Sequence, residues 1–174
     1  MNDGAAAKAT EAMDFLVEAV EQIAPQSWDQ PSNLEGWSIR DLVDHVTGSA
    51  AKIVALVKGG EVAQAPSQLD DPVAQLRELG DGLRDTLAAA DQDALRQALR
   101  FPVFGLTIHG WDVYRSQHRP VDLPEGLLAF CRQVVESVPE DELRRPGLFG
   151  PAQPVPQDAT PTARLMAYVG RPVD

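Results

Sequence analysis

The stretch "SIRDLVDHVTGSAAKIVALVKGG", residues 38–60, decides the fold class of this 174-residue chain. Its apolar residues recur every three or four positions, at Ile39, Leu42, Val46, Ala50, Ile53 and Val57. This period matches one face of an α-helix, so the spacing predicts a helix with a single buried stripe. Ser38 and Asp41 form a capping-box pattern at its start, and Gly59 and Gly60 are typical of its end.

The same period predicts further helices on both sides of this stretch. Residues 9–23 carry an apolar stripe that stops before Pro25, and residues 71–87 begin with an Asp-Pro pair that suits the first turn of a helix. We then expect a short helix over 91–101 and a separate helix that begins at Pro102, since proline is tolerated best in a first turn.

The remaining third of the chain is rich in proline. Apolar spacing predicts a helix over 127–138, and the segment 144–159 is expected to be a loop or a short strand. A last short helix should begin at Thr160 as its N-cap, with Pro161 in its first turn, and end at Gly170.

These helices predict an all-α fold, most simply an up-down four-helix bundle with short C-terminal additions. We expect a single domain over 1–174, with the bundle at about 4–118 and a C-terminal extension at about 119–174. No internal repeat and no glycine-rich phosphate loop is found in the sequence.

The charge of the chain excludes some partners. Its 15 basic and 26 acidic residues give a net charge of −11, which repels nucleic acid and anionic membrane surfaces. No stretch has the roughly 20 apolar residues of a membrane span, and the N-terminus lacks the pattern of a secretory signal. We therefore expect a cytoplasmic protein whose Cys131 is a buried, inert thiol.

Two histidines border apolar stripes on two different predicted helices. His45 lies beside Val46, and His109 lies beside Ile108, so the two rings can meet across the core. A neutral imidazole is the commonest transition-metal ligand, and Asp112, one turn after His109, could orient its ring or add an oxygen ligand. The alternative is a pair of edge histidines that bind backbone carbonyls or water.

Other polar and aromatic residues have simpler interpretations. Trp37 and Trp111 favour packing at the end of a bundle over stacking on a substrate. Arg40 and Arg115 are expected to be solvated charges, unless one lies beside a pocket and receives a carboxylate. His118 lies at a helix end before a proline, where a metal ligand is not expected.

Two segments carry a resemblance to a known family. "NLEGWSIRDLVDHVTGSA", residues 33–50, and "FGLTIHGWDVYR", residues 104–115, resemble the signature segments of the DinB-like fold in its mycothiol-dependent maleylpyruvate isomerase branch. The ending, residues 149–174, is similar to that of an actinobacterial group of metal-binding proteins in this branch. The resemblance implies a four-helix bundle that holds one divalent metal, such as zinc or nickel, on His45 and His109. It also implies mycothiol as a thiol cofactor that binds the metal.

One position departs from the pattern of this branch. The third metal ligand usually lies one helical turn before the histidine of the fourth helix, and Gly105 occupies that position here. Catalytic divalent metals typically have three protein ligands. Three functions therefore remain open: a divalent-metal-binding protein with an incomplete site, a thiol-dependent transferase or isomerase acting on a small electrophile, and a non-catalytic bundle that binds a small molecule or forms a homodimer.

Overall fold

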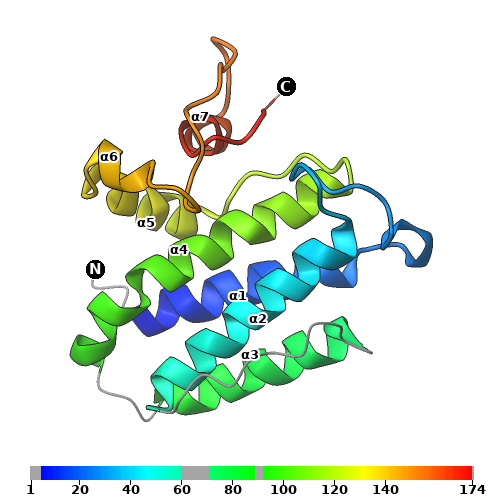
Figure 1. Ribbon diagram of the computed structural model, residues 1–174. Coiled ribbons are helices and arrows are strands. Elements are labelled where there is room, and N and C mark those ends of the chain that lie inside the picture. Colours follow the sequence, from blue (N-terminus) through cyan, green and yellow to red (C-terminus); the bar gives the residue numbers. More distant parts are fainter. Residues whose placement is uncertain (1–4, 60–70, 89–91, 174) are drawn as a thin grey trace. The chain divides into compact units, whose positions relative to one another are not determined.

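The computed structural model describes residues 5–59, 71–88 and 92–173. These residues form α1 (Ala5–Glu21), a short 3-10 helix η1 (Pro25–Ser27), α2 (Ile39–Val57), α3 (Pro72–Ala88), α4 (Gln92–Ser116), α5 (Glu125–Glu136), α6 (Glu140–Leu143) and α7 (Pro161–Tyr168) (Figure 1). They include no β-strand beyond one isolated bridge between Pro31 and Ser38, which confirms the all-α fold class. None of their helices is both long and apolar enough to cross a lipid bilayer.

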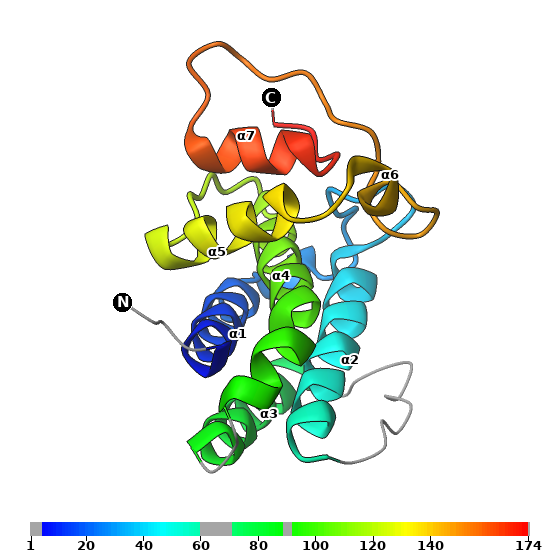
Figure 2. The same ribbon diagram turned by 90° about the vertical axis from the view of Figure 1, so that its left-hand side faces the viewer.

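The chain divides into two compact units, Met1–Val121 and Asp122–Asp174. In the first unit, α3 and α4 each pack against both α1 and α2. The helices therefore form a ring in the order α1, α3, α2, α4, and α2 lies beside α4 in both ribbon views (Figures 1 and 2). This ring buries the predicted apolar stripes against one another.

The contacts of α1 show how its neighbours are directed. Along α1, Phe15 contacts Tyr114 and Ala19 contacts Gln117, so residue numbers rise together in α1 and α4. In contrast, Asp14 contacts Arg84 and Glu21 contacts Arg77, so residue numbers fall along α3 as they rise along α1. Helix α1 is thus parallel to α4 and antiparallel to α3.

Helices α2 and α3 run in the same direction, because α2 is antiparallel to α4. His45, early in α2, lies beside His109, late in α4, whereas Leu56 and Pro102 at the opposite ends line one pocket. The directions are therefore up, down, down, up, in place of the strict alternation of the simplest up-down bundle.

The helix starts follow the predicted caps. The Ser38 hydroxyl accepts from the Asp41 amide, while the Asp41 carboxylate accepts from the Ser38 amide, so the capping box is confirmed. Asp71 and Thr160 each accept from the backbone amide three residues ahead. Gly170, after the last helix, has a φ of +86°, as expected for a C-terminal stop. The segment 144–159 contains no strand and is loop.

The predicted break at Pro102 is wrong, because α4 continues through this residue. A proline inside a helix removes one backbone hydrogen bond and costs about 3 kcal/mol. Leu99, Val103 and Phe104 are all buried on either side of it. We infer that this continuous apolar packing offsets the lost hydrogen bond and keeps 92–116 in one helix.

Two glycines of α4 differ in their surroundings, which gives a matched test of the helix packing. A Cβ at Gly110 would lie 2.9 and 3.1 Å from ring atoms of Phe15, whereas a Cβ at Gly105 would have no described atom within 4 Å. Gly110→Ala should therefore lower the free energy of unfolding by about 1–3 kcal/mol through overpacking. Gly105→Ala should raise it by about 0.5–1 kcal/mol through the lower backbone entropy of the unfolded chain. Urea unfolding of both variants measures these changes, and equal effects would contradict a close contact of α1 with α4.

Candidate functional site

Helices α2 and α4 bring His45 and His109 together. Their ring centroids lie 5.1 Å apart with an interplanar angle of 83°, so the edge of one ring faces the other. The Trp37 ring lies 5.0 Å from the His45 ring. The expectation that the two histidines meet is therefore confirmed, and Trp37 packs against His45.

Asp112 holds the His109 ring from one side. Its side chain is fully buried, with Oδ2 3.1 Å from His109 Nδ1 and Oδ1 accepting from the Asn33 side-chain amide at 2.8 Å. An ionised carboxylate only accepts hydrogen bonds, so Nδ1 carries the proton, and whenever the ring is neutral its lone pair lies on Nε2. Asp112 thus orients the ring, which is one of its two predicted roles. Its role as a direct metal ligand stays a prediction.

Asn33 and Ser116 complete this network, and the sequence analysis assigned neither of them a role. The Asn33 backbone amide donates to Ser116 Oγ at 3.0 Å. The Ser116 hydroxyl lies 3.0 Å from Asn33 Oδ1 and 2.7 Å from the carbonyl oxygen of Asp112. The segment before α2 is therefore tied to α4 at the residue that orients His109.

A tight turn in that segment positions Asn33 and Trp37 for these contacts. The Ser32 amide donates to the Trp37 carbonyl at 2.8 Å, and the Ile39 amide donates to the Gln30 carbonyl at 2.9 Å. Gly36 lies within the turn with a φ of +81°, which favours glycine over residues with a side chain. The turn lets Asn33 reach α4 while Trp37 reaches His45.

The surroundings of His45 keep its ring neutral. Its side chain has an exposed edge, but partial burial against its neighbours lowers its pKa below the ordinary value of 6.5. The electrostatic influence of His109 and then of Lys52 lowers this pKa further. A neutral imidazole has a lone pair for a metal ion or a hydrogen bond at pH 7.

The separation of the two histidine rings is that of an ordinary edge-to-face ring contact and also that of two imidazoles on one metal ion. A tetrahedral ion about 2.0–2.1 Å from each ligating nitrogen would place the two ring centres roughly 5 Å apart. The observed 5.1 Å matches that separation. No group of three or more His, Cys, Asp or Glu side chains suited to a metal occurs in the part of the chain that the structure describes. Among the described residues the site therefore has two adjacent imidazoles, and Gly105 contributes no third side chain.

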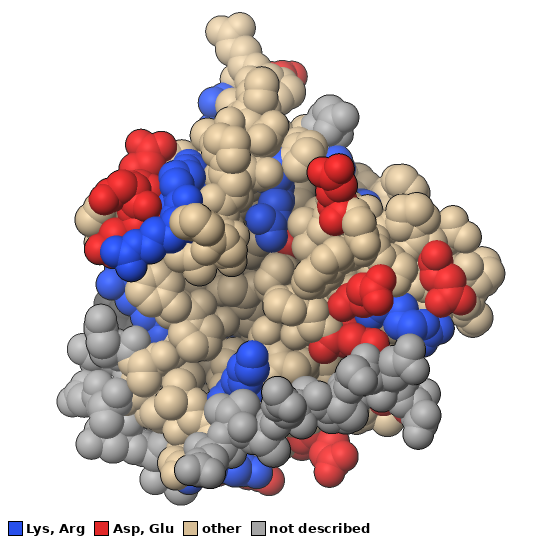
Figure 3. Space-filling model, in the orientation of Figure 1, with Lys and Arg blue, Asp and Glu red and all other residues tan. Residues whose placement is uncertain are grey.

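A pocket of about 350 Å³ lies directly beside His109. Its walls come from α2 and α4 and consist of Ser49, Lys52, Ile53, Leu56, Pro102, Gly105, Leu106 and His109. On the face seen in Figure 3, residues other than Lys, Arg, Asp and Glu make up most of the central surface, with a few Lys or Arg side chains among them. Because Ile53, Leu56, Pro102 and Leu106 line the pocket, His109 borders a mainly apolar space.

The other residues singled out from the sequence have structural surroundings. Trp111 is buried and its Nε1 donates to the Val121 carbonyl at 3.2 Å, which confirms a packing role. Arg115 lies over the Trp111 ring, and Arg40 pairs with the exposed carboxylate of Asp29 at 3.1 Å. His118 is exposed just beyond the end of α4. These residues do not border the pocket beside His109.

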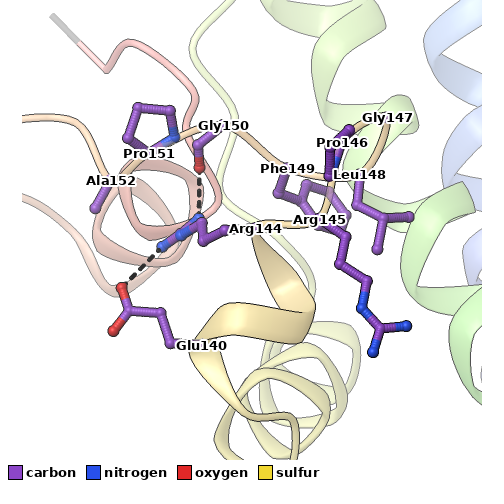
Figure 4. A pocket seen from close by; sticks show the side chains of 10 residues that line it. All are labelled: Glu140, Arg144, Arg145, Pro146, Gly147, Leu148, Phe149, Gly150, Pro151 and Ala152. Atoms are coloured by element: carbon purple, nitrogen blue, oxygen red, sulfur yellow. Dashed lines mark hydrogen bonds and ion pairs between the residues drawn. The ribbon is translucent and has the colours of Figure 1, made fainter.

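A second pocket, of about 500 Å³, lies within the unit Asp122–Asp174 (Figure 4). Its main cation, Arg144, already donates to the carbonyls of Gly150 and Tyr168 and lies 3.7 Å from the Glu140 carboxylate. These interactions stabilise the loop over 144–152 and occupy the guanidinium. The histidine pair is therefore the stronger candidate for function.

One family model matches the chain. Its description is mycothiol maleylpyruvate isomerase N-terminal domain, and the match covers residues 9–114, which is more than half of the sequence. The matched span contains His45, Gly105, His109 and Asp112. No curated protein and no solved structure matches the chain.

The Asp112 contact predicts the tautomer of His109. In the metal-free protein, we expect the neutral His109 ring to carry its proton on Nδ1, because the buried carboxylate accepts from that atom. Asp112→Asn should shift the population toward the Nε2–H tautomer, since an amide can also donate. Nitrogen-15 NMR of the histidine rings measures both states. An unchanged tautomer in Asp112→Asn would contradict the orienting role, and His118, outside this network, serves as an internal control.

The lowered pKa of His45 predicts how stability depends on pH in the metal-free protein. The unfolded chain takes up a proton near pH 6.5, above the pH at which folded His45 does so. The free energy of unfolding should therefore decrease as the pH falls through 6.5 toward the folded pKa, and this contribution should be constant above 6.5. Urea unfolding at several pH values measures the slope, which His45→Gln should reduce. An NMR titration with His45 at or above pH 6.5 would contradict the prediction.

Proposed function

The chain belongs to the mycothiol maleylpyruvate isomerase N-terminal domain family, and from this we propose that His45 and His109 bind one divalent metal ion weakly. The observation that carries the proposal is the 5.1 Å separation of the two rings, which suits one ion, such as zinc or nickel. Asp112 supports it, because a carboxylate that orients a metal-binding histidine is a common feature of such sites.

The affinity for metal should be low because α4 supplies one ligand where an i, i+4 pair would supply two. Gly105 lies one turn before His109, and a side chain there would emerge on the same helix face about 5–6 Å away at Cβ. The remaining coordination positions would be filled from solution, by water or by a small thiol. Mycothiol is the thiol that the family description suggests.

A divalent ion at this site would supply one kind of chemistry. Its charge stabilises a thiolate over a thiol, so a thiol that contacts it is a nucleophile at neutral pH. The residues of the chain have separate tasks: His45, whose pKa is lowered by burial, and His109 each offer a ring nitrogen, and Asp112 holds the proton at Nδ1 of His109. Thiol-dependent transferase or isomerase activity on a small electrophile is the enzymatic form of this proposal.

Substitution of Gly105 tests the proposal. We expect the protein, purified without an affinity tag and dialysed against a chelator, to bind zinc or nickel weakly and at no more than one ion per chain. Gly105→Glu and Gly105→Asp should bind more tightly, by at least about tenfold, because a third ligand joins the two imidazoles. The open space at Gly105 means that the new side chain should not disturb the fold. Calorimetric titration measures both affinity and stoichiometry.

Two variants separate a new ligand from a change in stability. Gly105→Ala shares the loss of glycine but adds no ligand, so its metal affinity should equal that of the parent protein. His45→Gln combined with Gly105→Glu should lose the gain. The proposal fails if folded Gly105→Glu binds neither zinc nor nickel more tightly than Gly105→Ala does.

A further inference from the structure

The pocket between α2 and α4 has the composition of a small-molecule site. Ile53, Leu56, Pro102 and Leu106 give it apolar walls, and its volume of about 350 Å³ falls in the range typical of ligand pockets. Leu56 is 41% exposed, so part of the apolar wall of the pocket faces solvent. Burial of this apolar surface by a ligand would contribute favourable free energy to binding.

Lys52 gives the pocket a positive charge at its edge. The side chain is exposed and lines the pocket, and none of the described residues forms an ion pair or hydrogen bond with it. The chain as a whole has a net charge of −11, but no aspartate or glutamate is among the described residues that line this pocket. The charge contributed by the described lining of the pocket is therefore positive, whereas the net charge of the chain is negative.

Gly105 makes the space for a ligand. It lines the pocket beside Leu106 and His109, and a Cβ added there would have no described atom within 4 Å. Any larger side chain would extend into this open space. The same residue that leaves the metal site without a third ligand thus widens the pocket next to it.

We propose that this pocket binds a small amphipathic carboxylate, with its apolar body between α2 and α4 and its carboxylate at Lys52. The apolar walls select the body of the ligand, and the uncompensated ammonium group selects an anionic end over a neutral or cationic one. Ser49 and His109 add polar atoms at the same pocket. The proposal does not require a metal, so it stands apart from the proposed function.

Octanoate and its neutral analogue 1-octanol test the proposal in chelator-treated, metal-free protein. We expect saturable binding of octanoate by calorimetry, weaker binding of 1-octanol, and NMR shifts in the amides of Gly105, Leu106 and His109. Lys52→Met keeps the aliphatic stem but removes the charge, and should weaken octanoate about fivefold while leaving 1-octanol unchanged. Lys58→Met removes one charge from the exposed end of the same helix and should alter neither affinity.

Gly105→Leu tests the position of the ligand. Its side chain should fill the pocket and abolish saturable binding of both probes, whereas the fold, followed by circular dichroism, should be retained. Equal affinities for octanoate and 1-octanol, or equal losses in Lys52→Met and Lys58→Met, would overturn the assigned carboxylate position. Absence of saturable octanoate binding would overturn the proposal altogether, whatever the result of the metal titrations.

Discussion

The buried carboxylate of Asp112 is the interaction on which the site depends. A fully buried charge is costly unless polar partners surround it, and here the Asn33 amide and the His109 ring contact its two oxygens. Because Asn33 belongs to the segment before α2, the same contacts fix that segment against α4. The contacts that stabilise the Asp112 carboxylate therefore hold both the segment before α2 and the ring of His109 on α4.

The sequence predicted the features that short-range physics controls. The capping box of Ser38 and Asp41 and the start at Thr160 involve residues a few positions apart, so local preferences determine them. The break at Pro102 was predicted wrongly because the tertiary packing of Leu99, Val103 and Phe104 outweighs the free-energy cost of a proline inside the helix. The pairing of His45 with His109 could be predicted because each histidine borders the apolar stripe of its helix. The roles of Asn33 and Ser116 depend instead on contacts between residues about 80 positions apart in the sequence. No periodic pattern encodes such contacts, and the single clue was that Asn33 precedes the glycine turn and Trp37.

The residue at position 105 affects the two proposed uses of the site, metal binding and carboxylate binding, in opposite ways. A carboxylate at this position would face His109 along one helix face and favour a metal ion, but it would occupy the space that the apolar pocket now has. A negative charge there would also disfavour an anionic ligand near Lys52. Metal affinity and carboxylate binding should therefore respond in opposite directions to the same substitution. This opposition lets the two uses be separated experimentally although they share His109.

The stretch "HGWD", residues 109–112, shows why a motif is weaker evidence for chemistry than its match suggests. Gly110 is required where Phe15 approaches α4, Trp111 packs and donates to the Val121 carbonyl, and the buried Asp112 ties α4 to the segment before α2. Folding alone accounts for these three residues. His109 is the member of the motif that also contacts the candidate site: Asp112 contacts its Nδ1, its ring lies beside the His45 ring, and it lines the pocket. The functional content of the motif therefore rests on His109 and on its neighbours, and one turn earlier Gly105 leaves open space.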